Sequence, residues 1–251
     1  MLLFKILLAP VLIALVSLAG RKWGHGVSGW LLGLPLNSGP ILFFLVLQEG
    51  KGFAAVAALG SLLGILAWAA FGLVYAYLCT RLPWWTCTLA GWAIYTVIAF
   101  LILKLHLDLT WAFVTVILVL TLMLMVFPRA SETASAVPPR KYDLLLRMAT
   151  ASAMVVGLTA VAKILGPMRS GILSAFPAYT TILAVFSHQQ SPVAAVKVLR
   201  GVTLGLYTAA SFFLVLSLCL LHLHAAASFS WAILTALVVQ GGSLMFFRYR
   251  L

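Results

Sequence analysis

The chain has 251 residues, of which 64% are hydrophobic and only 8% are charged. Soluble domains are about 45–50% apolar and about 25% charged, so this composition excludes a soluble globular protein and indicates an integral membrane protein. The net charge of +12 would suggest nucleic-acid binding in a soluble chain, but here the cations stand between apolar runs, where they hold loops in the cytosol and contact anionic lipid. We therefore expect membrane lipid as a partner and no nucleic acid.

Nine apolar segments reach the length of about 20 residues that a helix needs to cross a membrane. They lie at about 2–20, 27–47, 53–79, 84–105, 109–127, 144–163, 170–187, 193–221 and 228–247. This pattern predicts an all-α, polytopic membrane protein with about nine transmembrane helices. A polar stretch, PRASETASAVPPRKYD at 128–143, divides the chain. We expect a membrane repeat at 1–105, a linker helix with a polar loop at 106–143, and a second membrane repeat at 144–251.

The second segment contains helix breakers in its middle, GLPLNSGPILFF at 33–44. The breakers are Gly33, Pro35, Gly39 and Pro40, which bend the chain or remove backbone donors. Hydrocarbon tolerates an interrupted helix only inside protein or beside a wet cavity, where Asn37 and Ser38 would offer polar groups. The ordinary alternative is that the breakers are merely tolerated and that the hydroxyl bonds back to its own helix.

The chain also matches itself at an offset of 142 residues, without a gap, from residue 2 to residue 35. The matched pairs include Lys5 and Arg147, Arg21 and Lys163, Gly24 and Gly166, Pro35 and Pro177, Ser38 and Thr180, and Phe44 and Phe186. Matched glycines, prolines and cations at one offset indicate an internal duplication. Four segments match in each half and the fifth has no partner, so an odd number of crossings separates the copies. We therefore expect two inverted-topology four-helix repeats joined by a linker helix.

The second copy has its own break in the seventh segment, SAFPAYTTILAVF at 174–186. Pro177 makes this break, and three hydroxyls follow it. Interrupted helices at matching positions of two repeats are the usual sequence pointer to a transporter's midplane site, and half-helix N-termini suit an anion. We expect the breaks to cross near mid-membrane and to frame a polar substrate pocket. Its predicted substrate-binding residues are Asn37, Ser38, Tyr179, Thr180 and Thr181.

Polar residues follow both breaks at the ends of their segments. Gln48 and Gln190 correspond at the same offset, and Glu49 and His188 stand beside them. An ionisable group at the edge of a span is a candidate for proton coupling, since His changes its charge near neutral pH. The alternative is that all four are interfacial residues that end a helix.

Lysines and arginines favour one side of the predicted topology. Loops after odd-numbered segments hold Arg21, Lys22, Arg81, Arg129, Arg140, Lys141, Lys197, Arg200, Arg248 and Arg250. Loops on the other side hold Lys51, Lys104, Lys163 and Arg169. This bias predicts a multi-pass protein of a cell membrane, the bacterial inner membrane being favoured, with the N-terminus outside and the C-terminus in the cytoplasm. The matched cations Arg21 and Lys163 are candidate contacts for an anion or a lipid phosphate.

The sequence contains no nucleophile elbow, phosphate-binding loop, zinc motif or pair of intramembrane carboxylates, so we expect neither an enzyme nor a cofactor. The three cysteines have no CxxC spacing, and His222 and His224 lack a third ligand, so we expect no metal. Asp108 is predicted to start a helix with its carboxylate as the cap.

A cation at the end of the first helix, a G-x-x-x-x-FP-x-x-T motif and a helix opening with AAxKxLRGxxLGLY resemble the small four-helix GlpM-type membrane proteins. The residues that carry the resemblance are Gly171, Phe176, Pro177, Thr180, Lys197, Arg200, Gly205 and Tyr207. The first half departs from the pattern, with Leu34 for Phe176 and Ala57 for Lys197. The resemblance implies a fused, inverted pair of units that would otherwise assemble as antiparallel dimers, and it leaves a homodimer open. It brings no defined activity.

These observations together favour a secondary transporter that moves a small anionic or polar metabolite by rocking two inverted halves about a midplane site. One alternative is a lipid-linked carrier or flippase for a polyprenyl phosphate, which would grip the phosphate with Arg21 and Lys163. The other is a membrane subunit of an envelope assembly that transports nothing.

Overall fold

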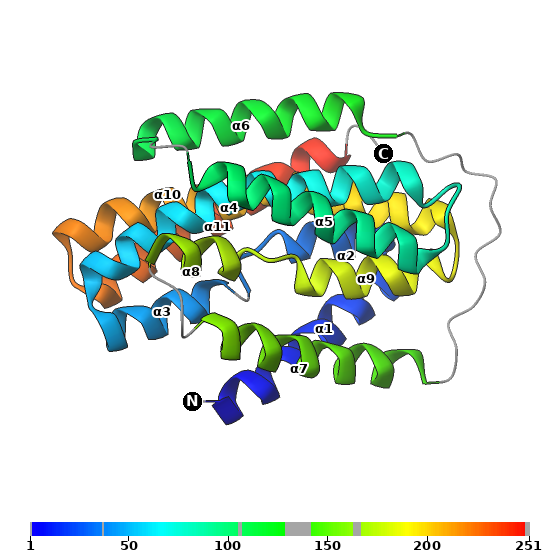
Figure 1. Ribbon diagram of the computed structural model, residues 1–251, viewed down its shortest axis with the longest axis horizontal. Helices are drawn as coiled ribbons and strands as arrows, with labels where there is room; N and C mark the ends of the chain where they lie inside the picture. Colours follow the sequence, from blue (N-terminus) through cyan, green and yellow to red (C-terminus); the bar gives the residue numbers. More distant parts are fainter. Residues whose placement is uncertain (1, 37, 105–106, 129–141, 163–166, 249–251) are drawn as a thin grey trace.

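The computed structural model describes residues 2–36, 38–104, 107–128, 142–162 and 167–248, which form eleven α-helices (Figure 1). The helices are α1 (Leu2–Trp23), α2 (His25–Leu32), α3 (Ser38–Glu49), α4 (Lys51–Leu78), α5 (Trp84–Ile102), α6 (Leu109–Val126), α7 (Asp143–Ala162), α8 (Pro167–Ser174), α9 (Ala178–His188), α10 (Pro192–His222) and α11 (Ala225–Arg248). The prediction of an all-α fold is confirmed for these residues. Helices cover each of the nine expected segments, and the second and seventh segments are each divided in two.

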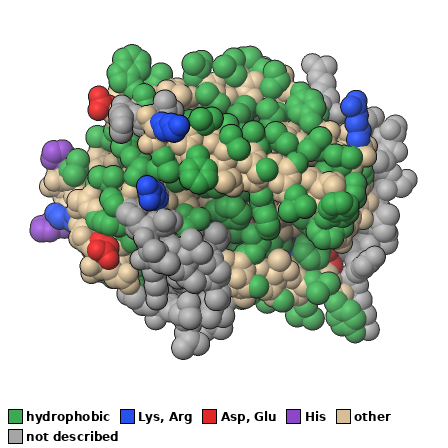
Figure 2. Space-filling model, viewed as in Figure 1, with side chains coloured by type: hydrophobic (Ala, Val, Ile, Leu, Met, Phe, Trp, Pro, Cys, Tyr) green, Lys and Arg blue, Asp and Glu red, His purple; other side chains and the backbone are tan. Residues whose placement is uncertain are grey.

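Six stretches of the described chain are long and apolar enough to cross a membrane: α4, α5, α6, α8 with α9, α10, and Ala225–Ser243 of α11. The outer helices expose large apolar side chains, including Trp111, Leu118 and Met125 of α6. Met125 is 75% exposed. Figure 2 shows hydrophobic side chains over most of one flank, with the few charged ones toward the two ends. An apolar surface of this extent belongs in lipid, so the chain is a multi-pass membrane protein.

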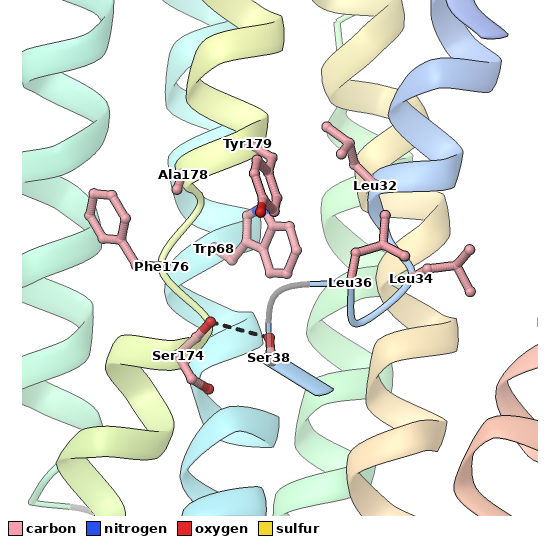
Figure 3. A pocket seen from close by; sticks show the side chains of 9 residues that line it. All are labelled: Leu32, Leu34, Leu36, Ser38, Trp68, Ser174, Phe176, Ala178 and Tyr179. Carbon is pink, nitrogen blue, oxygen red and sulfur yellow. Dashed lines mark hydrogen bonds between the residues drawn. The ribbon is translucent and has the colours of Figure 1, made fainter. Parts of the chain in front are cut away.

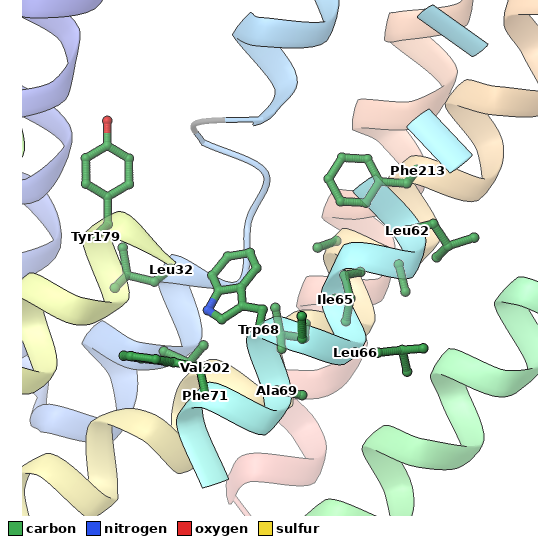
Figure 4. Packing of buried hydrophobic residues seen from close by; sticks show 14 of the residues in the cluster. Leu32, Leu62, Ile65, Leu66, Trp68, Ala69, Phe71, Tyr179, Val202 and Phe213 are labelled. Atoms are coloured by element: carbon green, nitrogen blue, oxygen red, sulfur yellow. The ribbon is translucent and has the colours of Figure 1, made fainter. Parts of the chain in front are cut away.

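The two longest helices, α4 and α10, form the centre of the bundle. Phe71 and Tyr75 of α4 and Leu206 and Phe213 of α10 are fully buried. Figure 4 shows the side chains of α4 packed toward those of α10 and of the two broken helices. This core holds the short helices that end at the breaks.

A short helix from the other half of the chain packs on each central helix: α2 packs on α10, and α8 packs on α4. A Cβ atom built on Gly29 of α2 would lie 1.9 Å from the carbonyl oxygen of Val198, and one built on Gly171 of α8 would lie 2.0 Å from that of Ala57. The helix backbones therefore touch directly, as small residues allow in membranes. Gly171 follows Gly29 by 142 positions and Val198 follows Ala57 by 141, so the two contacts occupy equivalent places.

The central helices contribute glycines to the same two contacts. A Cβ on Gly201 of α10 would lie 2.2 Å from the carbonyl oxygen of Gly26, and one on Gly60 of α4 would lie 2.4 Å from that of Met168. Both glycines begin a G-x-x-x-G motif, at 60–64 and at 201–205. Such a motif marks a close helix–helix face, and the sequence prediction did not use it.

The remaining helices cover the outside of this core. α1 and α7 pack on each other, and α6 lies on the opposite side over α4 and α10 (Figure 1). The hydroxyls of Thr121 in α6 and Tyr207 in α10 lie 2.8 Å apart and join these helices. Asp108 does precede α6 as expected, but its side chain makes no cap hydrogen bond. Asp143, predicted as the last linker residue, is instead the first residue of α7.

Candidate functional site

The first helix break separates α2 from α3 and lies where the prolines and glycines predict it. α2 closes with tight turns, in which the amides of Gly33 and Leu34 donate to the carbonyls three residues earlier, at 3.1 and 3.2 Å. The Gly39 amide then donates to the Pro35 carbonyl at 2.8 Å. Pro40 is tolerated in the first turn of α3, where a backbone donor would have no partner within the helix. Asn37, a predicted substrate contact, lies outside the described residues.

The second break, between α8 and α9, repeats this backbone arrangement. The amides of Ala175 and Phe176 donate to the carbonyls three residues earlier, both at 3.0 Å, and the Thr181 amide donates to the Pro177 carbonyl at 2.8 Å. These three donors follow Gly33, Leu34 and Gly39 by 142 positions. The amide of Ala178 also bonds two residues back at 2.8 Å, as that of Leu36 does at 2.7 Å. The two breaks therefore share one hydrogen-bonding pattern.

The two breaks meet around one small pocket (Figure 3). Its lining comes from both breaks, from the helix ends beside them and from α4: Leu32, Leu34, Leu36, Ser38, Trp68, Ser174, Phe176, Ala178 and Tyr179. About 20 Å³ of it is open to the centre of a water-sized sphere, which is room for about one water molecule. The prediction placed Ser38 and Tyr179 here, and both line the pocket. Most of the lining is apolar, whereas the sequence favoured a polar pocket.

A serine cluster closes one side of the pocket. The Ser38 hydroxyl donates to the Ser174 carbonyl at 3.1 Å, which joins α3 to the end of α8 (Figure 3). The Ser174 hydroxyl lies 2.8 Å from that of Ser61 in α4, and Ser61 also reaches the Gly171 carbonyl at 3.1 Å. All three serines are buried. These bonds tie the two halves together at the breaks.

The predicted hydroxyls of Thr180 and Thr181 lie in the first turn of α9 and hold tryptophans. Trp68 Nε1 donates to Thr180 Oγ1 at 3.1 Å, and Trp92 Nε1 donates to Thr181 Oγ1 at 3.2 Å. Thr181 also donates to the Pro177 carbonyl at 2.7 Å. Both threonines are buried but neither lines the pocket, so in this conformation Thr180 holds the indole of Trp68 and Thr181 holds that of Trp92 rather than facing the cavity.

A carbonyl near each break receives a donor from the last helix of the opposite half. Tyr95 of α5 donates to the Ile172 carbonyl at 2.7 Å, and Gln240 Nε2 of α11 donates to the Trp30 carbonyl at 3.0 Å. Ile172 follows Trp30 by 142 positions, so the two acceptors are equivalent. These donors satisfy carbonyl groups that bent helix ends leave with weak partners. The sequence reasoning missed Trp68, Tyr95 and Gln240, although a buried Gln in an apolar helix is itself a signal.

The predicted edge residues are not brought together. Gln48 and Glu49 are exposed at the end of α3, whereas His188 and Gln190 lie at the far end of the bundle, where α9 leads into α10 (Figure 1). His188 Nδ1 lies 3.3 Å from the Tyr75 hydroxyl, and the two rings are edge-on with centroids 5.8 Å apart. Glu49 and His188 therefore cannot form one proton-transfer pair.

Of the two cations predicted to hold an anion, Arg21 lies at the end of α1 and Lys163 lies outside the described residues. An Arg21 guanidinium nitrogen lies 3.1 Å from Asp143 Oδ2. Within the described parts of the chain, no group of three or more His, Cys, Asp or Glu residues could hold a metal ion.

Comparisons with known proteins identify no relative: no family model, no curated protein and no solved structure matches the chain.

Proposed function

We propose that the chain is a secondary transporter in which two inverted repeats, α1–α5 and α7–α11, move a small anionic or polar metabolite past the two helix breaks. The observation that carries the proposal is that both breaks have the same backbone hydrogen bonds and border the same pocket. Broken helices that face each other from two repeats form the substrate sites of several transporter folds.

The reciprocal packing of the halves supports the inverted arrangement. α2 of the first half lies on α10 of the second, and α8 of the second lies on α4 of the first, through the equivalent glycines Gly29 and Gly171. α6 is the helix without a counterpart, and one unmatched crossing between two copies inverts the second copy. The resemblance of both halves to GlpM-type proteins belongs to this proposal.

The helix ends at the pocket support an anionic or polar substrate. α3 begins at Ser38 and α9 begins at Ala178, and both residues line the pocket. The N-terminal end of a helix carries roughly half a positive charge, so two such ends attract negative charge. No carboxylate is among the described residues that line this pocket, which disfavours a metal cation as cargo.

A pocket with room for about one water is too small for a metabolite, so this conformation is a closed state of the transporter. Opening would separate the halves at the bonds that now join them: Ser38 to Ser174, and Trp68 to Thr180. We expect substrate to bind after these bonds break, with the indole of Trp68 moving away from Thr180.

A thermal-stability screen of the detergent-purified protein tests the proposal. The probes are organic acids, amino acids, sugar phosphates, polyamines and polyprenyl phosphates. A ligand that binds only the folded state adds about 2.7 kcal/mol of stability at a hundredfold excess over its Kd. We expect a saturable rise in Tm with one water-soluble class, reduced in Ser38→Ala and Thr180→Val. Thr96→Val is the matched control, because Thr96 is exposed on α5 and bonds only to its own helix.

The other outcomes refute the proposal in different ways. A rise in Tm with polyprenyl phosphate alone would favour the lipid carrier. A flat response to every class, together with a protein that co-purifies through affinity capture, would favour the assembly subunit. Equal loss of the ligand effect in Thr96→Val would show that the pocket is not where the ligand binds.

A further inference from the structure

A buried charge cluster lies away from the pocket, where the end of α1 meets the start of α7. Asp143 and Arg147 of α7 are each only 5% exposed. Arg147 binds the carboxylate through two nitrogens, at 3.0 and 3.3 Å, and Arg21 of α1 adds a third contact at 3.1 Å. The Arg147 guanidinium also lies 5.0 Å from the centroid of the Phe186 ring. One carboxylate is therefore shared between two guanidinium groups.

Further positive charge faces the same place from α2 and α10. Lys197 of α10 stands one residue before Val198, whose carbonyl lies against α2 at Gly29. His25, the first residue of α2, has its pKa lowered by burial and, further, by the charges of Arg147 and Lys197. α2 begins after Gly24, which offers no side chain to cap the helix, so no side-chain oxygen at the N-cap position accepts from the first amides of α2. With Arg21, three cations face one carboxylate, which leaves a net charge of +2.

No acidic residue of the described chain other than Asp143 is near enough to neutralise this excess. Glu49 ends α3 and Asp108 precedes α6, and both stand at the other end of the bundle (Figure 1). A buried guanidinium that is incompletely paired is costly, so an excess of this kind favours binding of an anion. One turn before Arg21 on the same face of α1, the buried hydroxyl of Ser17 has no hydrogen-bond partner and offers a further donor.

The cluster lies at the level where lipid headgroups meet the protein. Trp23 and Tyr142, which flank it in sequence, are each 61% exposed, as aromatic residues of a membrane interface are. Leu145 and Leu146 follow on the outer surface of α7, and they are 61% and 53% exposed. Arg21 keeps 43% of its side chain exposed, so an anion in the headgroup layer can reach it.

We propose that Arg21, Arg147 and Lys197, together with the start of α2, form a binding site for the phosphate group of an anionic membrane lipid. Arg21 and Lys197, which are not fully buried, contact the phosphate directly, while Arg147 supplies positive charge from behind and is held in place by Asp143. The acyl chains lie along the exposed leucines of α7. This site is distinct from the pocket at the breaks, and it depends on membrane insertion but not on transport.

Lipid titration of delipidated protein in detergent tests this site, with bound lipid counted by native mass spectrometry. The probes are phosphatidylglycerol, phosphatidylcholine with the same acyl chains, and inorganic phosphate. We expect phosphatidylglycerol to bind more tightly than phosphatidylcholine. Arg21→Gln and Lys197→Gln should each weaken its binding about fivefold, which is the contribution of one cation to an anionic headgroup. Circular dichroism verifies that each variant is folded.

Lys22→Gln is the matched control, because Lys22 stands next to Arg21 but lies over the Trp23 ring, 5.1 Å from its centroid. It should weaken binding less than twofold. An equal loss in Lys22→Gln, or no preference for phosphatidylglycerol over phosphatidylcholine, would overturn the site. Binding of inorganic phosphate that depends on Arg21 and Lys197, without competition from phosphatidylglycerol, would overturn the lipid as its source. A flat substrate screen with intact lipid binding would refute only the transporter proposal.

Discussion

Replacing Gly29 or Gly171 with alanine tests the direct backbone contacts between the halves. The added Cβ of Gly29→Ala would lie 1.9 Å from the Val198 carbonyl oxygen and 3.0 Å from the Val202 amide nitrogen. Real Cβ atoms approach other atoms to about 3.0 Å at the closest, so α2 must retreat from α10 by roughly 1 Å. The obstacle is backbone rather than a flexible side chain. Overpacking of this kind costs about 1–3 kcal/mol, which outweighs the helix-propensity gain of about 1 kcal/mol. Because the obstacle is backbone, we take the upper part of this cost range, about 2–3 kcal/mol, and expect a net loss of about 1–2 kcal/mol.

The same loss is expected for Gly171→Ala, where the Cβ would lie 2.0 Å from the Ala57 carbonyl oxygen. Gly241→Ala is the matched control, since a Cβ there meets nothing within 4 Å in the same kind of apolar helix, so its stability should stay level or rise slightly. The assay is reversible unfolding in mixed micelles with increasing dodecyl sulfate, followed by tryptophan fluorescence. If Gly29→Ala and Gly171→Ala unfold at the same detergent fraction as Gly241→Ala, the close contacts do not exist.

Three further predictions concern the polar groups. Asp143→Asn should lower the free energy of unfolding by about 3–5 kcal/mol, because it leaves Arg147 charged and buried, and unfolding titrations would measure the loss. His25 has a lowered pKa in the folded state, so its contribution to stability is complete above its unfolded pKa of about 6.5 and is lost as pH falls toward the folded value. His25→Gln should therefore flatten the acid side of a Tm–pH profile, and an unchanged slope would contradict this. Tyr95→Phe removes one of the two donors to the Ile172 carbonyl, which keeps the Ala175 amide, and should cost about 0.5–1.5 kcal/mol by unfolding titration, whereas no loss would mean that the Ala175 amide alone satisfies this carbonyl.

The helix breaks were predictable because their causes are local. Pro35 and Pro177 cannot continue a helix, and their separation of 142 residues, shared by other matched residues, led us to predict a duplication. The pairing of α2 with α10 was not predictable in the same way. A G-x-x-x-G motif indicates a helix surface that allows close packing, but it does not identify the helix that packs there. The chemistry of the pocket was predicted only in part. Thr180 offers a hydroxyl in any conformation, but only the tertiary structure puts the indole of Trp68 on it.

The ion pair at the start of α7 shows a different limit. Asp143 and Arg147 stand four residues apart, which is the spacing of a helical salt bridge, yet the Pro- and Ser-rich stretch before them indicated that the loop runs to Asp143. The start of α7 depends on a tertiary ion pair, because Asp143 binds Arg21, which lies 122 residues away in the sequence. Local propensity cannot supply that information.

The packing of the short helix α2 on α10, from the other half of the chain, has a consequence for biosynthesis. Gly29 and the Val198 carbonyl that it contacts are 169 residues apart. At 5–20 residues per second, a ribosome therefore needs about 10–30 s after making α2 to synthesise the part of α10 on which α2 packs. During that interval the Trp30 carbonyl also lacks the hydrogen bond from Gln240, which is synthesised later still. The first half must therefore stay in the bilayer with an unsupported bent helix. We expect nascent chains that stop before α10 to be held by an insertase or removed by a membrane protease.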